Sequence, residues 1–106
     1  MNKRSNDHVV LVLLDARKLI EREEDWWDGN GAHGRRLCPL LAIDAAASKR
    51  RPHDLNGPLK YLYKSTGTPL GIPAWNDTPG RTHAEVLQAF DRAIALRLQE
   101  LQVVGA

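Results

Sequence analysis

Residues 82–102 read THAEVLQAFDRAIALRLQELQ, and this pattern predicts a long amphipathic helix. Thr82 and Glu85 have the spacing of a capping box, in which each side chain accepts a hydrogen bond from a free backbone amide at the helix start. Further along, apolar residues recur at intervals of three and four on one face: Leu87, Phe90, Ile94, Leu98 and Leu101. We therefore expect a helix from Thr82 to about Gln102 with one buried face.

A second amphipathic pattern lies near the start of the chain. Between Asp7 and Glu24, apolar residues recur at helical spacing, and Asn6 or Asp7 suits the N-cap. The β-branched run from Val9 to Val12 would also fit a short strand. We favour a helix because the residues that follow this run are good helix formers.

Proline marks the starts of two middle helices, because its fixed φ suits the first turn. Pro39 begins one that runs to about Ser48, and Pro58 opens a shorter one over residues 59–65, with Gly67 as its left-handed stop. The sequence thus predicts a mainly α fold, with about four helices around one core. Residues 1–106 are expected to form this single small domain, with 1–6 flexible.

Two tryptophan-bearing loops connect the expected helices. Residues 26–37 hold Trp26, Trp27 and three glycines, which indicates a loop, and Asn30-Gly31 would also suit a tight hairpin turn. Residues 68–80 hold Trp75, three prolines and two glycines, which indicates an irregular connection.

Bulk composition narrows the class of protein. The chain has 106 residues, of which 42% are hydrophobic, with one cysteine and a formal net charge of +2. The lone Cys38 excludes a disulfide-rich secreted domain and indicates a cytoplasmic protein. The apolar run from Val9 to Leu14 is much shorter than the roughly 20 residues that cross a bilayer, so no membrane association is expected.

The most specific motif of the chain is Trp-Asn-Asp at residues 75–77, then Arg81-Thr82, then Glu-Val-Leu at residues 85–87. Upstream of it lie the Trp26-Trp27 pair and the segment CPLLA at residues 38–42. This order of motifs resembles that of a bacterial and phage family of short proteins of unknown function, DUF6197. The resemblance implies a mostly helical fold and suggests an accessory role in a phage or mobile element. It carries no catalytic role.

The tryptophan loops are the leading candidate for a binding surface, because tryptophan and arginine concentrate at interface hot spots and loops often carry function. We interpret the chain as a non-catalytic interaction module with a protein partner. The structural alternative is that Trp75 fills the core while its polar neighbours lock the turn. The candidate binding residues are Trp26, Trp27, Trp75, Asn76, Asp77 and Arg81.

The charge pattern supports a second hypothesis. Residues 21–28 hold five acidic side chains and one arginine, whereas residues 35–51 hold five basic side chains and one aspartate. The basic segment could contact a phosphate backbone, which makes nucleic acid an alternative partner. The two blocks could also pair between copies of the chain and form a homo-oligomer. The basic residues are Arg35, Arg36, Lys49, Arg50 and Arg51.

A thiol enzyme is the third hypothesis. Cys38 is expected just before a helix start, a position that favours a thiolate, but no known catalytic-cysteine signature surrounds it. A non-catalytic role is therefore favoured. The four histidines and one cysteine lack a Cys-x-x-Cys or His-x-x-x-His pairing, so neither a metal nor another cofactor is expected.

Overall fold

The computed structural model describes residues 6–68 and 71–104, so most of the expected flexible segment, residues 1–6, lies outside the described residues. Their secondary structure is helical and contains no strand, which confirms the mainly α fold. The elements are α1 (His8–Leu19), the short 3₁₀ turn η2 (Glu23–Asp25), α2 (Pro39–Ser48), α3 (Asn56–Thr66), α4 (Ile72–Asn76) and α5 (His83–Val104).

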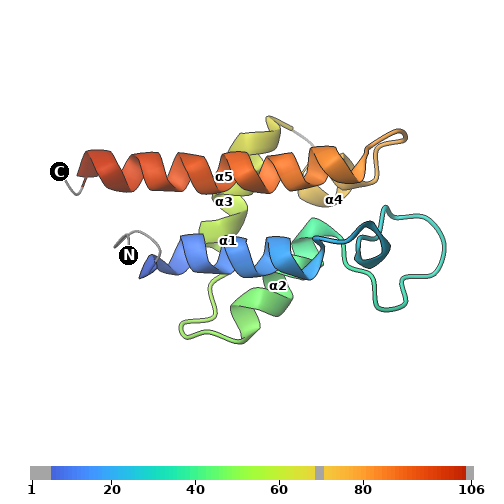
Figure 1. The fold of residues 1–106 in the computed structure, drawn as a ribbon, viewed down its shortest axis with the longest axis horizontal. Coiled ribbons are helices and arrows are strands. Elements are labelled where there is room, and N and C mark those ends of the chain that lie inside the picture. The colour runs from blue at the N-terminus through green and yellow to red at the C-terminus, as the bar shows by residue number, and fades with distance from the viewer. Residues whose placement is uncertain (1–5, 69–70, 105–106) are drawn as a thin grey trace.

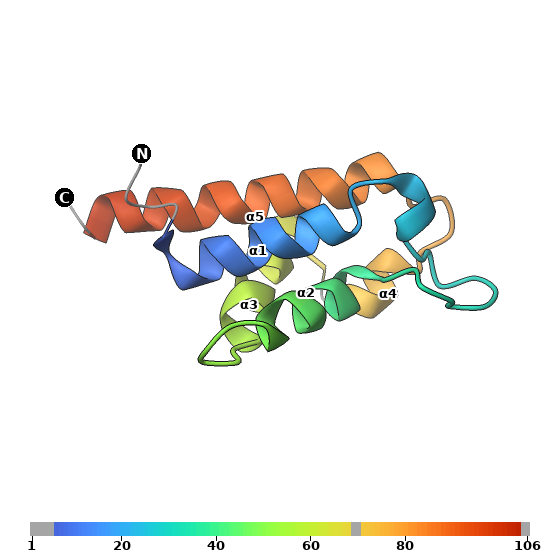
Figure 2. The same cartoon turned by 60° about the horizontal axis from the view of Figure 1, so that its bottom comes forward.

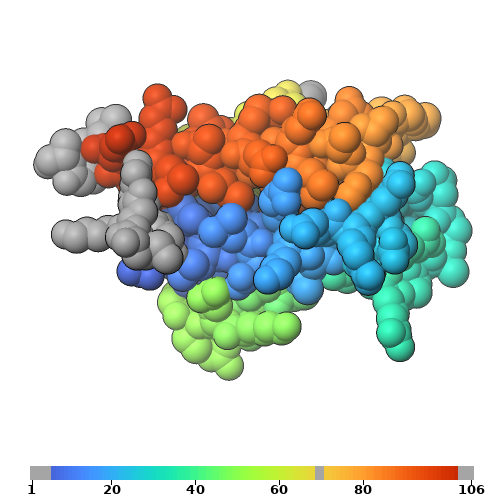
Figure 3. Space-filling model, in the orientation of Figure 1, coloured from blue at the N-terminus to red at the C-terminus, as the bar shows by residue number. Residues whose placement is uncertain are grey.

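Helices α1 and α5 lie side by side and antiparallel, and α2 runs back along the other side of α1 (Figures 1 and 2). Helix α3 crosses behind α1 and α5 in the view of Figure 1. The start of α1 and the end of α5 are at one end of the molecule, which we call the terminal end. Residues 26–38 and the turn before α5 are at the opposite end, which we call the loop end (Figures 1 and 3).

The helix starts follow the local signals in the sequence. Asp7 caps α1 by accepting a hydrogen bond from the amide of Val10 at 3.1 Å. Pro39 occupies the first turn of α2, and Gly67 ends α3 in the left-handed conformation with φ 64°. These three boundaries were predicted, and the structure confirms them.

Three local expectations need correction. Helix α1 ends at Leu19 rather than near Glu24, because the acidic run that follows is unfavourable at a helix C-terminus and forms η2 instead. The segment expected to be irregular contains α4, whose second residue is Pro73. Residues 26–37 form no hairpin: Trp26 and Leu37 meet in an isolated parallel bridge.

The core lies where α1, α2, α3 and α5 meet. Its small residues on α2, Ala42, Ala46 and Ala47, are buried and let α1 approach closely. The largest fully buried apolar side chains come from all four helices, so each contributes to one continuous core: Phe90, Leu13, Ile43 and Leu62. Within the described residues, no helix has both the length and the apolar character needed to cross a bilayer.

Candidate functional site

The loop end is organised around the side chain of Asn76, which closes α4 and is 1% exposed. Its Oδ1 accepts a hydrogen bond from Trp26 Nε1 at 2.7 Å. Its Nδ2 donates to the carbonyl of Trp27 at 2.9 Å and to Asp77 Oδ1 at 3.1 Å. We call these four residues the Asn76 clamp, because one amide joins the start of the 26–37 loop to the end of α4.

Gly29 makes the second contact between this loop and the end of α4. Its φ is 90°, and a Cβ built there would lie 2.4 Å from Asp77 Oδ1. A side chain at this position would both strain the backbone and collide with the carboxylate. The loop therefore follows the clamp closely because residue 29 is glycine.

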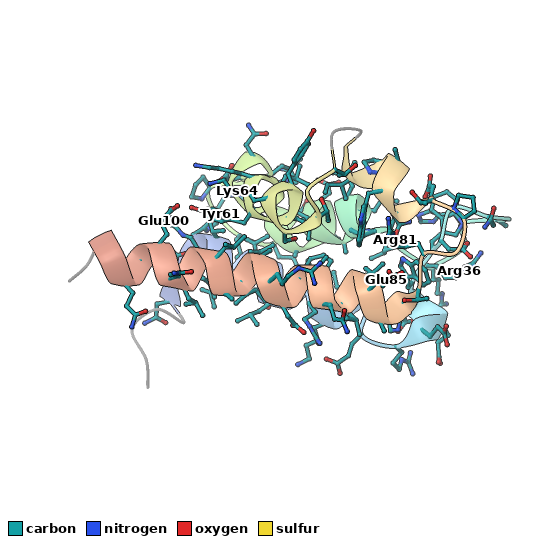
Figure 4. All side chains as sticks on the ribbon, turned by 90° about the horizontal axis from the view of Figure 1, so that it is seen from above. Arg36, Tyr61, Lys64, Arg81, Glu85 and Glu100 are labelled. Carbon is teal, nitrogen blue, oxygen red and sulfur yellow. The ribbon has the colours of Figure 1, made fainter. Side chains whose placement is uncertain are left out.

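Arg81 joins α4 to the start of α5. Its Nε donates to the carbonyl of Trp75 at 3.0 Å, and its guanidinium lies 4.1 Å from the centre of that indole ring. Its Nη1 is 3.6 Å from Glu85 Oε2. Figure 4 shows Arg81 and Glu85 at the same end as Arg36.

The predicted capping box at the start of α5 is present. Thr82 Oγ1 accepts from the Glu85 amide at 3.1 Å, and Glu85 Oε1 accepts from the Thr82 amide at 2.9 Å. The hydrogen bond from the Thr82 amide lowers the pKa of Glu85. His83 completes this corner: its Nε2 donates to the Ile20 carbonyl at 2.7 Å, and its ring centre is 5.7 Å from that of Trp26.

The second tryptophan of the loop has a different environment. The Trp27 side chain is half-buried, its Nε1 donates to the Asn30 carbonyl at 3.0 Å, and its ring meets His33 edge to face at 4.8 Å between centres. A hydrogen bond from the Asn30 amide lowers the pKa of Asp28. We use the name loop surface for the charged and aromatic side chains of residues 27–36 that are not fully buried, together with Asp77, which lies beside Gly29 of the same loop: Trp27, Asp28, His33, Arg35, Arg36 and Asp77.

The structure divides the six predicted binding residues into two groups. Trp26, Trp75 and Asn76 are buried, with 7%, 8% and 1% of their surface exposed, so they hold the loop end together. The other three remain accessible: Trp27 and Arg81 are partly exposed, and Asp77 is exposed. Sequence reasoning missed the parts played here by Gly29 and His83. The Asp-Gly pair and the first residue after the capping Thr were the only local signals for them.

The five basic residues of the nucleic-acid hypothesis do not form one patch. Arg35 and Arg36 precede α2, whereas Lys49, Arg50 and Arg51 follow its ten residues, which span about 15 Å. Arg50 is bound to Asp15, with Nη2 2.7 Å and Nε 3.1 Å from the same carboxylate oxygen. Arg36 donates to the carbonyl of Ala32 within its own loop.

Cys38 is a free thiol at the N-cap of α2 and is 7% exposed. Nothing in the described part of the chain makes a hydrogen bond to its sulfur. The side chains of His33, His53 and His83 make their contacts elsewhere: with Gly34 O, with Ser48 and Asp44, and with Ile20 O. Residues 6–68 and 71–104 also contain no group of three or more metal-ligating side chains.

A second polar cluster lies at the terminal end, around Arg97 of α5. Its Nε and Nη2 donate to the two oxygens of Asp7 at 3.0 and 2.9 Å, and its Nη1 donates to Tyr61 Oη and to Glu100 Oε1, both at 3.1 Å. The Tyr61 hydroxyl also donates to Glu100. We call these four residues the Arg97 network; Figure 4 shows its Tyr61 and Glu100 far from Arg81.

Within the Arg97 network, the pKa values of the two carboxyl groups are lowered and that of the tyrosine is raised. The hydrogen bond from Arg97 lowers the pKa of Asp7, and the hydrogen bond from Tyr61 lowers the pKa of Glu100. Burial and the Glu100 carboxylate raise the pKa of Tyr61. The network therefore favours charged carboxylates and a neutral phenol, and it ties the start of α1 to α3 and α5.

Comparison with known proteins identifies one family. DUF6197, described as a family of unknown function, matches residues 4–96, which cover the Asn76 clamp, the loop surface and most of α5. No curated protein and no solved structure matches the chain.

Proposed function

Because the chain belongs to DUF6197, whose function is unknown, its role has to be inferred from its own geometry, and we propose that it is a non-catalytic protein-binding module. The observation that carries the proposal is that the Asn76 clamp holds the Trp27 backbone from inside the molecule. The Trp27 side chain is left on the loop surface, against His33. Tryptophans in such positions are common centres of binding energy.

The ordered conformation of the 26–37 loop supports a role in binding a protein partner. Gly29, Gly31 and Gly34 all have positive φ. The Trp27 indole donates a hydrogen bond to the Asn30 carbonyl of its own loop, and the Trp27 backbone carbonyl accepts one from Asn76. A loop that is already ordered loses less conformational entropy when a partner binds. This arrangement therefore suits a surface that keeps its shape during recognition.

The charges of the loop surface favour a protein over a nucleic acid. The loop surface holds two carboxylates, Asp28 and Asp77, and two guanidinium groups, Arg35 and Arg36, so it carries both signs. A polyanion would be repelled by the carboxylates, whereas a protein interface commonly has a rim of mixed charge. In its cellular setting, we propose a cytoplasmic protein of bacterial or phage origin, with an accessory role in a phage or mobile element.

Affinity capture with the full chain tests the proposal. The bait would be exposed to a cytosolic lysate of the source cell, with and without nuclease, beside Trp27→Ala and the exposed loop variant Arg35→Glu. Tyr63→Ala is the matched control, because Tyr63 is an exposed aromatic residue of α3. We expect a protein that survives nuclease, is retained by Tyr63→Ala and is lost with both loop variants.

Other outcomes separate the alternatives. Capture that disappears with nuclease would favour the nucleic-acid hypothesis, and capture of a second copy of the chain would identify the partner as itself. A partner that both loop variants retain would show that the loop surface is not the binding site. Circular dichroism of each variant checks that a variant which no longer binds the partner is still folded.

A further inference from the structure

A separate concavity lies between α1 and α2, and none of its lining residues belongs to the loop surface. Its volume is about 430 Å³, and it is lined by Asp15, Lys18 and Leu19 of α1, by Ala46 of α2 and by Lys49, which directly follows α2. Pockets of a few hundred Å³ are the usual size for small-molecule ligands. We call this concavity the α1–α2 groove.

The floor of the α1–α2 groove is apolar. Ala46 is 2% exposed and Leu19 is half-buried against the core. Because the side chain of Ala46 ends at Cβ, it forms part of the floor without projecting into the concavity. This floor can contact a flat or aliphatic body but offers it no polar partner.

The rim of the groove carries unbalanced positive charge. The single lining carboxylate, Asp15, is already bound by Arg50, with both nitrogens within 3.1 Å of the same oxygen. Lys18 and Lys49 are exposed. Within residues 6–68 and 71–104, no carboxylate lies within ion-pair distance of either amine.

We propose that the α1–α2 groove binds a small amphipathic anion, an apolar body that carries one carboxylate. Leu19 and Ala46 contact the apolar body, and Lys18 on α1 and Lys49 at the end of α2 contact the carboxylate. The charge selects an anion because the lining aspartate is neutralised from within the protein. The cavity volume favours a small molecule over a partner helix.

The test is titration of the full chain with naphthoate, followed by heteronuclear NMR of the backbone amides. We expect saturable shifts concentrated on the facing parts of α1 and α2. Neutral naphthylmethanol and cationic naphthylmethylamine have the same apolar body, so they should bind more weakly, the cation most weakly of all. These two probes separate recognition of charge from contact with the apolar floor.

Substitutions of the two lysines identify the groups that recognise the anion. Lys18→Ala and Lys49→Ala should each weaken naphthoate binding by up to about fivefold, the scale of an exposed ion pair. The double variant Lys18→Glu with Lys49→Glu should remove detectable binding. Lys64→Ala on α3 is the matched control and should bind as the unchanged protein does. Lys18→Arg and Lys49→Arg keep the positive charge, so they should retain the affinity that the alanine variants lose.

Four results would overturn the proposal. Equal affinity for naphthylmethanol would show an apolar patch without anion recognition. Unchanged naphthoate binding by the double glutamate variant, or shifts that map away from α1 and α2, would place the ligand elsewhere. The absence of saturable shifts would show that the groove is not a binding site. Both lysines are exposed, so circular dichroism should show that their variants remain folded.

Discussion

Each end of the molecule has one side chain that makes hydrogen bonds to three partners. At the loop end this is the neutral amide of Asn76, and at the terminal end it is the charged guanidinium of Arg97. Asn76 is 1% exposed, but the Arg97 side chain keeps 23% of its surface accessible. Two of the Asn76 partners are uncharged, while the strongest contacts of Arg97 are to a carboxylate. The loop end should therefore respond to lost packing and hydrogen bonds, and the terminal end to pH and salt.

The largest effect should follow from Asn76→Ala. The substitution leaves the buried Trp26 N–H without an acceptor and opens a small cavity, so we expect a loss of about 3 kcal/mol in the free energy of unfolding. Urea unfolding, followed by tryptophan fluorescence, measures it. Asn56→Ala, at an exposed position, is the control. A similar small loss for both variants would mean that the clamp is not a major source of stability.

Gly29→Ala should have the next largest effect, about 2 kcal/mol, because it adds a clash with the Asp77 carboxylate to the strain of positive φ. Gly31→Ala is matched to it: φ is 70° and nothing lies within 4 Å of the added Cβ, so only about 1 kcal/mol is expected. Urea unfolding of both variants separates the free-energy cost of the collision with Asp77 from that of the strained backbone.

A double substitution checks the origin of the Gly29 effect. Asp77→Ala removes the carboxylate that the added methyl group would meet. In that background, Gly29→Ala should cost no more than Gly31→Ala does. Additive losses from Gly29→Ala and Asp77→Ala would show that the close approach does not limit residue 29.

Asp7→Asn should cost about 1–2 kcal/mol at neutral pH, because it removes the charge that faces Arg97 while keeping a side chain that can cap α1. Arg97 lowers the pKa of Asp7 below the ordinary 3.8. The ionised carboxylate therefore stabilises the fold above about pH 3.8, and this contribution is lost as the pH falls through the lowered folded pKa.

Urea unfolding of the protein and of Asp7→Asn across this pH range tests the assignment. The stability difference between them should be constant at neutral pH and should disappear in acid. The difference caused by Asn76→Ala should change little over the same range. A pH-independent effect of Asp7→Asn would mean that the cap, rather than the charge, is what Asp7 contributes.

The parts of the fold that sequence predicted are those with local signals. The capping box at Thr82 and Glu85, the proline at residue 39 and the glycine at residue 67 each act within one turn of their helix, so their effect can be read from a few residues. Helix α4 was missed because it spans only Ile72–Asn76 and contains a proline, a pattern also typical of a turn.

The roles of the polar residues could not be read in the same way. Asn76 meets Trp26 from 50 positions away, and Arg97 meets Asp7 from 90 positions away. No local pattern shows which of the adjacent Trp26 and Trp27 is buried, because that depends on where α4 lies. The motif itself was visible in the sequence, but its division into a buried clamp and a loop surface required the tertiary structure.

Asp91→Asn should have the smallest effect, about 0.3 kcal/mol, and its comparison with Asp7→Asn isolates the role of burial. Arg17 holds Asp91 through Nε at 2.7 Å and Nη2 at 3.4 Å, an arrangement like that of Arg97 and Asp7. However, the Asp91 side chain is 57% exposed, against 16% for Asp7. Water and salt should screen the exposed pair, so added salt should abolish the effect of Asp91→Asn before that of Asp7→Asn. Equal losses in urea unfolding would mean that burial does not distinguish the two pairs.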